Sequence, residues 1–190
     1  DGANAQFVNS VGGRWNYEGT GHDLLTYMDC TAADNTFNYS RSSASPQQII
    51  TVQTNDYHNL EITGDDIKTP LATYVIDIEG YLLISNNANF NVNTFDNNIT
   101  IAGDWNNLAT VGNGFTEGTE TVTFDGTGAQ DLIATNIGTE TYYDVLFITS
   151  GTTTCYPHLH VDRDITISGA AVLAPQPNKN VNVARHWLNW

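Results

Sequence analysis

Positive charge is scarce in this sequence. Only 6 residues are Lys or Arg, against 21 Asp or Glu, so the formal net charge is −15. Nucleic-acid backbones and anionic membrane surfaces attract proteins of the opposite sign. We therefore expect no nucleic-acid partner, and we expect the acidity to keep the particle soluble and to attract cations.

Long apolar runs and sorting segments are also missing. No stretch approaches the ~20 apolar residues of a transmembrane helix, so we expect no membrane insertion. No signal peptide is visible, so we expect a chain that is either cytoplasmic or already mature. The Thr- and Asn-rich, Lys-poor composition favours a secreted, mature chain, located outside the cell or at its surface.

Sustained helical periodicity is absent, and a strand pattern takes its place. In a strand, alternate side chains point to opposite faces, so a triplet with apolar outer residues buries those two and exposes the middle one. Eight such triplets occur, and they predict one buried face and one mostly solvated face: 37–39, 60–62, 82–84, 99–101, 122–124, 146–148, 165–167 and 181–183.

The middle residues of these triplets recur every 16 to 24 residues. Antiparallel hairpins turn in only about two to five residues, whereas one coil of a parallel β-helix has the observed length. We predict an all-β, right-handed parallel β-helix (solenoid) of about eight coils, with each triplet stacked on the next. The alternative is a β-sandwich, whose strands also alternate.

A longer repeat organises the chain. The phrase DNNITIAGDW, which ends at Trp105, returns as NKNVNVARHW, which ends at Trp187, and SVGGRW ends at Trp15. Self-similarity of this kind indicates a repeat architecture. We predict one solenoid domain over 1–190, in which 1–15 end a preceding repeat or link to it, and 16–105 and 106–190 are two divergent repeats of ~85 residues.

The motif VTFDGTGAQ, followed by YYDVLFITSG and DITISG, gives the chain a family resemblance. It resembles the repetitive β-solenoid segments of large secreted bacterial surface proteins and adhesins. The resemblance covers nearly the whole chain and is stronger in 106–190 than in 16–105. It implies a fold and an extracellular setting, and it implies no catalytic residues and no cofactor.

Three polar side chains have the spacing of metal ligands. If Leu159 and Val161 point inward, then His158, His160 and Asp162 project from one face of a strand, and His with carboxylate suits zinc or similar ions. The competing interpretation is ordinary alternation of polar residues on a solvated face.

Carboxylate pairs could in principle support glycoside hydrolysis. The pairs are Asp65 with Asp66, Asp77 with Glu79, and Asp162 with Asp164. The outward positions show no acidic ladder, so we predict that the protein is not an enzyme. Exposed aromatic residues would instead suit sugar binding, and the candidates are Tyr142, Tyr143 and Tyr156.

These observations lead to one functional expectation and one alternative. We expect a structural extracellular protein, a subunit of a head-to-tail surface filament or adhesin stalk whose partner is another copy of itself, joined by strand stacking or by exchange of a segment such as 5–11. The alternative is a carbohydrate- or matrix-binding module that recognises surface glycans. The two Cys residues, Cys30 and Cys155, lie many coils apart and are predicted to be unbonded within one chain.

Overall fold

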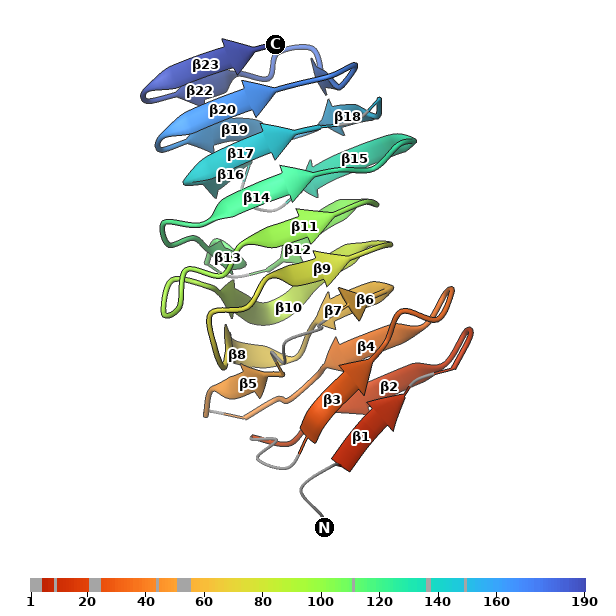
Figure 1. Ribbon diagram of the computed structural model, residues 1–190. Helices are drawn as coiled ribbons and strands as arrows, with labels where there is room; N and C mark the ends of the chain where they lie inside the picture. The colour runs from red at the N-terminus through yellow and green to blue at the C-terminus, as the bar shows by residue number, and fades with distance from the viewer. Residues whose placement is uncertain are drawn as a thin grey trace.

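The computed structural model describes residues 5–8, 10–20, 25–43, 45–50, 56–110, 112–135, 138–148 and 150–190. Within these ranges all regular structure is β-strand, and the strands wind into a parallel solenoid of about seven turns (Figure 1). The strands on the near side run to the right and those on the far side to the left as the chain rises, so the coil is right-handed. The predicted fold class is confirmed, and no β-sandwich forms.

The described strands lie on three faces of the solenoid. Face 1, nearest the viewer in Figure 1, is a parallel ladder from β6 to β23, with β1 and β3 paired beneath it. An isolated bridge between Cys30 and Tyr57 ties β3 to β6. The face 1 strands are β1 (Ala5–Val8), β3 (Leu25–Asp29), β6 (Asp56–Tyr57), β9 (Ile76–Ile78), β11 (Ile99–Ile101), β14 (Thr121–Phe124), β17 (Asp144–Phe147), β20 (Asp164–Ile167) and β23 (His186–Asn189).

Face 2 is the longest continuous ladder, and all of its strands are parallel. One column of inward residues, from Trp15 through Phe37, Leu60, Leu82 and Trp105, shows the turn length of 22 to 23 residues directly. The strands of face 2 are β2 (Arg14–Tyr17), β4 (Thr36–Tyr39), β7 (Asn59–Ile62), the first half of β10 (Leu82–Asn91), β12 (Trp105–Ala109), β15 (Ala129–Ala134), β18 (Thr152–Cys155) and β21 (Val172–Pro175).

Face 3 consists of two separate ladders. β10 turns from face 2 into face 3 at Asn86, whose φ of 60° is left-handed, a conformation that Asn tolerates better than most residues. The lower ladder contains β5 (Gln47–Ile49), β8 (Asp65–Pro70), the second half of β10 and β13 (Phe115–Thr116). The upper ladder contains β16 (Thr139–Tyr142), β19 (His158–Val161) and β22 (Val181–Val183).

The triplets form strands as predicted, but they do not form one stack. The first three stack on face 2, whereas Ile99 stacks on Ile76 and Val122 of face 1, and not on Leu82. The last triplet, 181–183, lies on face 3. All faces require the same alternation of inward and outward residues, so alternation alone does not identify a face.

One triplet was assigned to the wrong side. In 146–148 we expected Leu146 and Ile148 to be inward, but Val145 and Phe147 are buried and Leu146 is half-exposed. Because side chains alternate with a period of two, a shift of one residue exchanges the two sides of a strand. The inward and outward sides were exchanged because Leu146, Phe147 and Ile148 are all apolar, so the triplet itself does not show which side is buried.

Two middle residues expected in solvent are covered. Asn38 and Glu61 are only 5% exposed. The guanidinium of Arg14 donates to Glu61, at 2.8 Å from Nη1 to Oε1, and the Tyr81 hydroxyl donates to the same oxygen at 2.8 Å. Desolvation acts to raise the pKa of Glu61, but these hydrogen bonds outweigh it and hold the pKa below its usual range.

The Trp phrases do not mark equivalent positions. Trp15 and Trp105 share the inward column of face 2, and Trp105 is fully buried among Phe115, Phe124 and Tyr142. Trp187 belongs to β23 of face 1 instead. The phrase therefore describes a strand, a corner and the next strand, and such a unit fits at more than one corner.

Glycine allows the corner between faces 1 and 2 to close. Gly80, Gly103 and Gly126 occupy this corner in consecutive turns. A Cβ at Gly103 would collide with the backbone carbonyl of Gly80, and a Cβ at Gly126 would collide with that of Ala102. The spacing of the turns therefore leaves no room for a side chain here.

Two remaining expectations concern Cys and Pro. Cys30 and Cys155 are both buried and free, which confirms that they form no bond within the chain. The two Pro residues of 173–180 would be expected to interrupt strand pairing, but Val172–Pro175 is a strand that pairs with β18. Pro175 lies on β21, the edge strand of face 2, where a missing N–H costs little.

Candidate functional site

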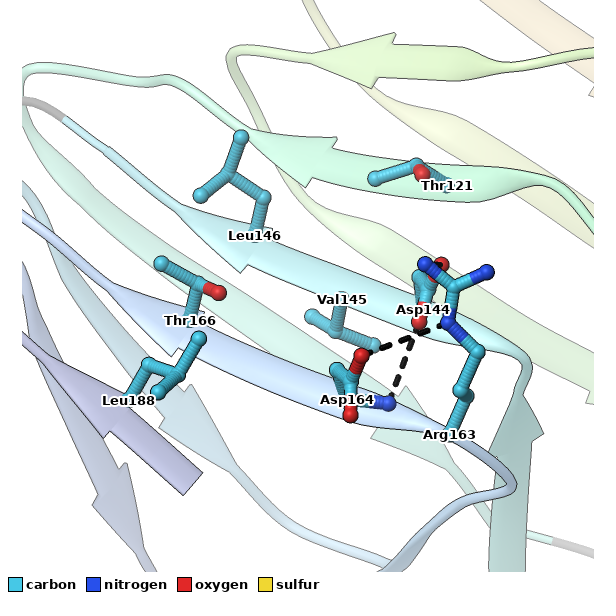
Figure 2. A pocket seen from close by; sticks show the side chains of 8 residues that line it. All are labelled: Thr121, Asp144, Val145, Leu146, Arg163, Asp164, Thr166 and Leu188. Atoms are coloured by element: carbon cyan, nitrogen blue, oxygen red, sulfur yellow. Dashed lines mark hydrogen bonds and ion pairs between the residues drawn. The ribbon is translucent and has the colours of Figure 1, made fainter. Parts of the chain in front are cut away.

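A shallow groove crosses the outer side of face 1 near the top of the solenoid (Figure 2). Its floor contains outward residues that are in register on consecutive turns, Leu146, Thr166 and Leu188. Its complete lining is Thr121, Asp144, Val145, Leu146, Arg163, Asp164, Thr166 and Leu188.

Two Asp and two Arg side chains form a network along one edge of the groove. Arg163 Nη2 lies 3.1 Å from Asp144 Oδ2, and Arg163 Nε lies 3.3 Å from Asp164 Oδ2. Arg185 Nη2, from the next turn, lies 3.3 Å from the same Asp164 oxygen. The backbone N–H of Asp164 also donates to Asp144 Oδ1 at 3.1 Å (Figure 2). The network thus links three consecutive turns.

His186 and Tyr143 complete this network. The His186 ring nitrogen Nδ1 lies 2.7 Å from Asp164 Oδ1, and the guanidinium carbon of Arg163 lies 5.2 Å from the centre of the Tyr143 ring. Desolvation acts to raise the pKa of Asp164, but hydrogen bonds from His186 and Arg163 and the charge of Arg185 hold it below its usual range. Asp164 is therefore an anion at neutral pH.

The network follows from a short sequence pattern that we overlooked. Three dipeptides, Tyr143-Asp144, Arg163-Asp164 and Arg185-His186, follow one another at intervals of 20 and 22 residues. Each dipeptide begins at the corner between faces 3 and 1, so equivalent members stack. The interval of about one turn between Arg163 and Arg185 is the signal in the sequence that the two side chains lie together.

The metal-ligand candidates are only partly brought together. Leu159 and Val161 point inward as expected. His160 Nε2 lies 2.9 Å from Asp162 Oδ1, whereas His158 Nδ1 accepts the backbone N–H of Asn180 at 3.1 Å. Across the described ranges, no group of three or more His, Cys, Asp or Glu side chains is placed to hold a metal ion.

The carboxylate pairs have separate partners. Asp162 contacts His160 and Asp164 contacts Arg163 and Arg185, while Asp65 accepts a hydrogen bond from Asn87 at 3.0 Å. In the third pair, Asp77 is half-buried on face 1 and Glu79 is exposed at the following corner.

The three candidate tyrosines have different surroundings. Tyr142 is fully buried, Tyr143 lies beneath Arg163, and Tyr156 is 42% exposed. A flat aromatic platform for a sugar needs neighbouring exposed rings, and these three do not supply one. The groove can bind a ligand through hydrogen bonds to the Asp and Arg side chains and through apolar contact with Leu146 and Leu188.

Comparisons with family models, with curated proteins and with solved structures found no match to this chain. In the part of the chain that the structure describes, no helix has the length and apolar character to cross a membrane.

Proposed function

We propose that the protein is a structural building block of an extracellular assembly, in which solenoids stack head to tail along a common axis. The observation that carries this proposal is the continuity of the ladders. The lowest and highest strands of face 1, β1 and β23, belong to one column, and those of face 2, β2 and β21, belong to another. A second copy placed above the first would continue both columns with the same strand direction.

Apolar side chains lie at both edges and suit such a contact. At the upper edge Val172, Trp187 and Trp190 are about half-exposed or more, and at the lower edge Val11 and Trp15 are similarly exposed. An open strand edge has backbone N–H and C=O groups that pair readily with another strand. A further coil, supplied by another copy, would cover both the edge and these side chains.

The two ends also differ in charge. Residues 156–190 contain three Lys or Arg and two Asp or Glu, a formal net charge of +1, whereas 1–35 contain one Arg and five Asp or Glu, a net charge of −4. Opposite charges steer two surfaces together and fix their orientation. Heterologous contacts of this kind form open filaments when they do not close into a ring.

Assembly can be tested by sedimentation and negative-stain microscopy at micromolar concentration. Seven turns at ~4.8 Å correspond to an axial repeat of ~34 Å for each subunit. We expect filaments with this repeat, and Trp187→Asp should abolish them because it places a charge within the stacked edge. Tyr74→Asp, which changes a 42% exposed aromatic residue in the middle turns between β8 and β9, is the matched control and should assemble normally.

Two results would contradict the proposal. One is a stable monomer of the unaltered chain whose circular dichroism shows an intact β-fold. The other is unimpaired assembly of Trp187→Asp. Antibody labelling of intact cells tests the extracellular location separately, and we expect surface labelling without permeabilisation.

One observation favours a second candidate function, the binding of surface glycans. The face 1 groove combines a few hydrogen-bonding side chains with apolar contacts, a combination common to small-ligand sites. A glycan array tests this alternative. Binding that is lost in Arg163→Ala, by a protein that stays monomeric, would favour a carbohydrate-binding module over a filament subunit.

A further inference from the structure

The interior of the solenoid contains two carboxyl groups beside face 3. Glu140, on β16, is 1% exposed and accepts hydrogen bonds from Trp105 Nε1 at 3.2 Å and from Asn107 Nδ2 at 3.0 Å. Glu120 is also 1% exposed; its Oε2 accepts the Gly118 N–H at 2.5 Å, and its Oε1 has no hydrogen-bond partner. The buried hydroxyl of Tyr142 likewise lacks a partner.

No strong cation neutralises these two groups. The described part of the chain places no Arg or Lys within ion-pair distance of either carboxyl. The donors that β12 supplies, Trp105 and Asn107, are neutral. The groups coupled electrostatically to the pair are all acidic or weakly acidic: Asp96, Glu117, Tyr142 and Cys155. His160 and Asp162 act on Glu117, and Lys179 acts on Cys155.

Burial therefore outweighs the hydrogen bonds that favour the ionised form of both carboxyl groups. Desolvation raises the pKa of Glu140 to about 8 and that of Glu120 to about 7, and it also raises the pKa of Glu117. The hydrogen bonds from Asn107 and Trp105 favour the ionised form of Glu140 but do not offset its burial.

The ladder of backbone hydrogen bonds on face 3 is interrupted beside the same groups. β13 pairs only with β10, and β16 pairs only with β19, so in the described turns no ladder joins β13 to β16. We call this break, between 115–116 and 139–142, the seam. Glu117 directly follows β13 and Glu140 lies on β16. Every other face is hydrogen-bonded through these turns, so the seam is where the coil can separate most easily.

We propose that the seam is a pH-sensitive switch, closed while Glu140 and Glu120 are neutral carboxylic acids and opened when they lose their protons to solvent. An isolated buried carboxylate is costly, and opening the seam hydrates it. The direction follows from the raised pKa values. The closed seam has its full stability below the ordinary Glu pKa, where both carboxyl groups are protonated. It loses the contribution of these groups as the pH rises through about 7 to 8.

Hydrogen exchange measured by mass spectrometry tests the switch. Peptides that cover 112–120 and 138–142 should open more at pH 9 than at pH 6, after correction for intrinsic exchange rates. For Glu140 alone, proton linkage gives an increase in the opening equilibrium on the order of 100-fold. Peptides from β4 and β7 should show no comparable change, because those strands lie several turns below the seam.

The double variant Glu120→Gln/Glu140→Gln removes both titrating groups and should lose this pH dependence. Glu79→Gln, at an exposed corner, is the matched control and should retain it. Equal opening of the seam at pH 6 and pH 9 in the unaltered chain would overturn the proposal, as would unchanged pH dependence in the double variant.

An infrared titration of the unaltered chain tests the proposal even if the double variant does not fold. We expect the carbonyl band of protonated carboxyl groups to persist at pH 6.5 and to vanish by pH 9. Absence of that band at pH 6.5 would show that both groups are ionised in the closed seam, and the switch would be refuted.

Discussion

Ile101→Asp places a carboxyl group at the centre of the stacked interior. Ile101 is fully buried, and its neighbours on the adjacent turns are Ile78 and Phe124. Loss of the side chain alone costs ~2–5 kcal/mol, as in other large-to-small core substitutions. The introduced Asp would avoid ionised burial by taking up a proton, which at pH 7 costs about 1.4 kcal/mol for each unit above its ordinary pKa of ~3.9, or ~4 kcal/mol.

The expected loss is therefore ~6–9 kcal/mol, a large part of the ~5–15 kcal/mol that stabilises a typical domain. Urea unfolding should be measured for Ile101→Asp, for Ile101→Ala and for Thr100→Asp. Thr100 points outward beside Asp77, so its substitution should cost no more than ~1 kcal/mol through like-charge repulsion.

The pH dependence makes the test stricter. The difference between Ile101→Asp and Ile101→Ala should fall from ~4 kcal/mol at pH 7 to ~1.5 kcal/mol at pH 5, because protonation becomes cheaper. Equal destabilisation by Ile101→Asp and Thr100→Asp would refute the assigned sides of β11. A difference between Asp and Ala that does not change with pH would refute burial of the carboxyl.

Two further predictions concern the corners and the corrected strand. Gly103→Ala should lower stability by ~1–3 kcal/mol in thermal melts, because its methyl group meets the Gly80 carbonyl. Gly128→Ala is the control and should be nearly neutral, because a methyl group there has open space. Similar melting temperatures for both variants would argue against close contact at the corner between faces 1 and 2. Phe147→Ala should cost ~3–5 kcal/mol and Leu146→Ala less than ~1 kcal/mol, and the reverse order in urea unfolding would restore the orientation first expected from the sequence.

The sequence by itself determined the repeating unit of this protein. Alternation of apolar and polar residues is a local property, so triplets such as 37–39 and 99–101 predicted strands with a buried side. Their recurrence after about twenty residues predicted the coil. Cys30 and Cys155 were predicted to be free because about six coils of ~4.8 Å each separate them, roughly 29 Å along the axis. A disulfide requires Cα atoms within about 7 Å.

Only the tertiary structure decided which residues lie on the same face. Turns differ in length, so the face that a triplet joins depends on every corner before it, and local alternation carries no such information. Arg163 and Arg185 meet Asp164 only because one turn separates them. Glu140 points into the core from a strand whose sequence, TETY, alternates like its neighbours. Its burial follows from Trp105 and Asn107, which are more than thirty residues away in the chain.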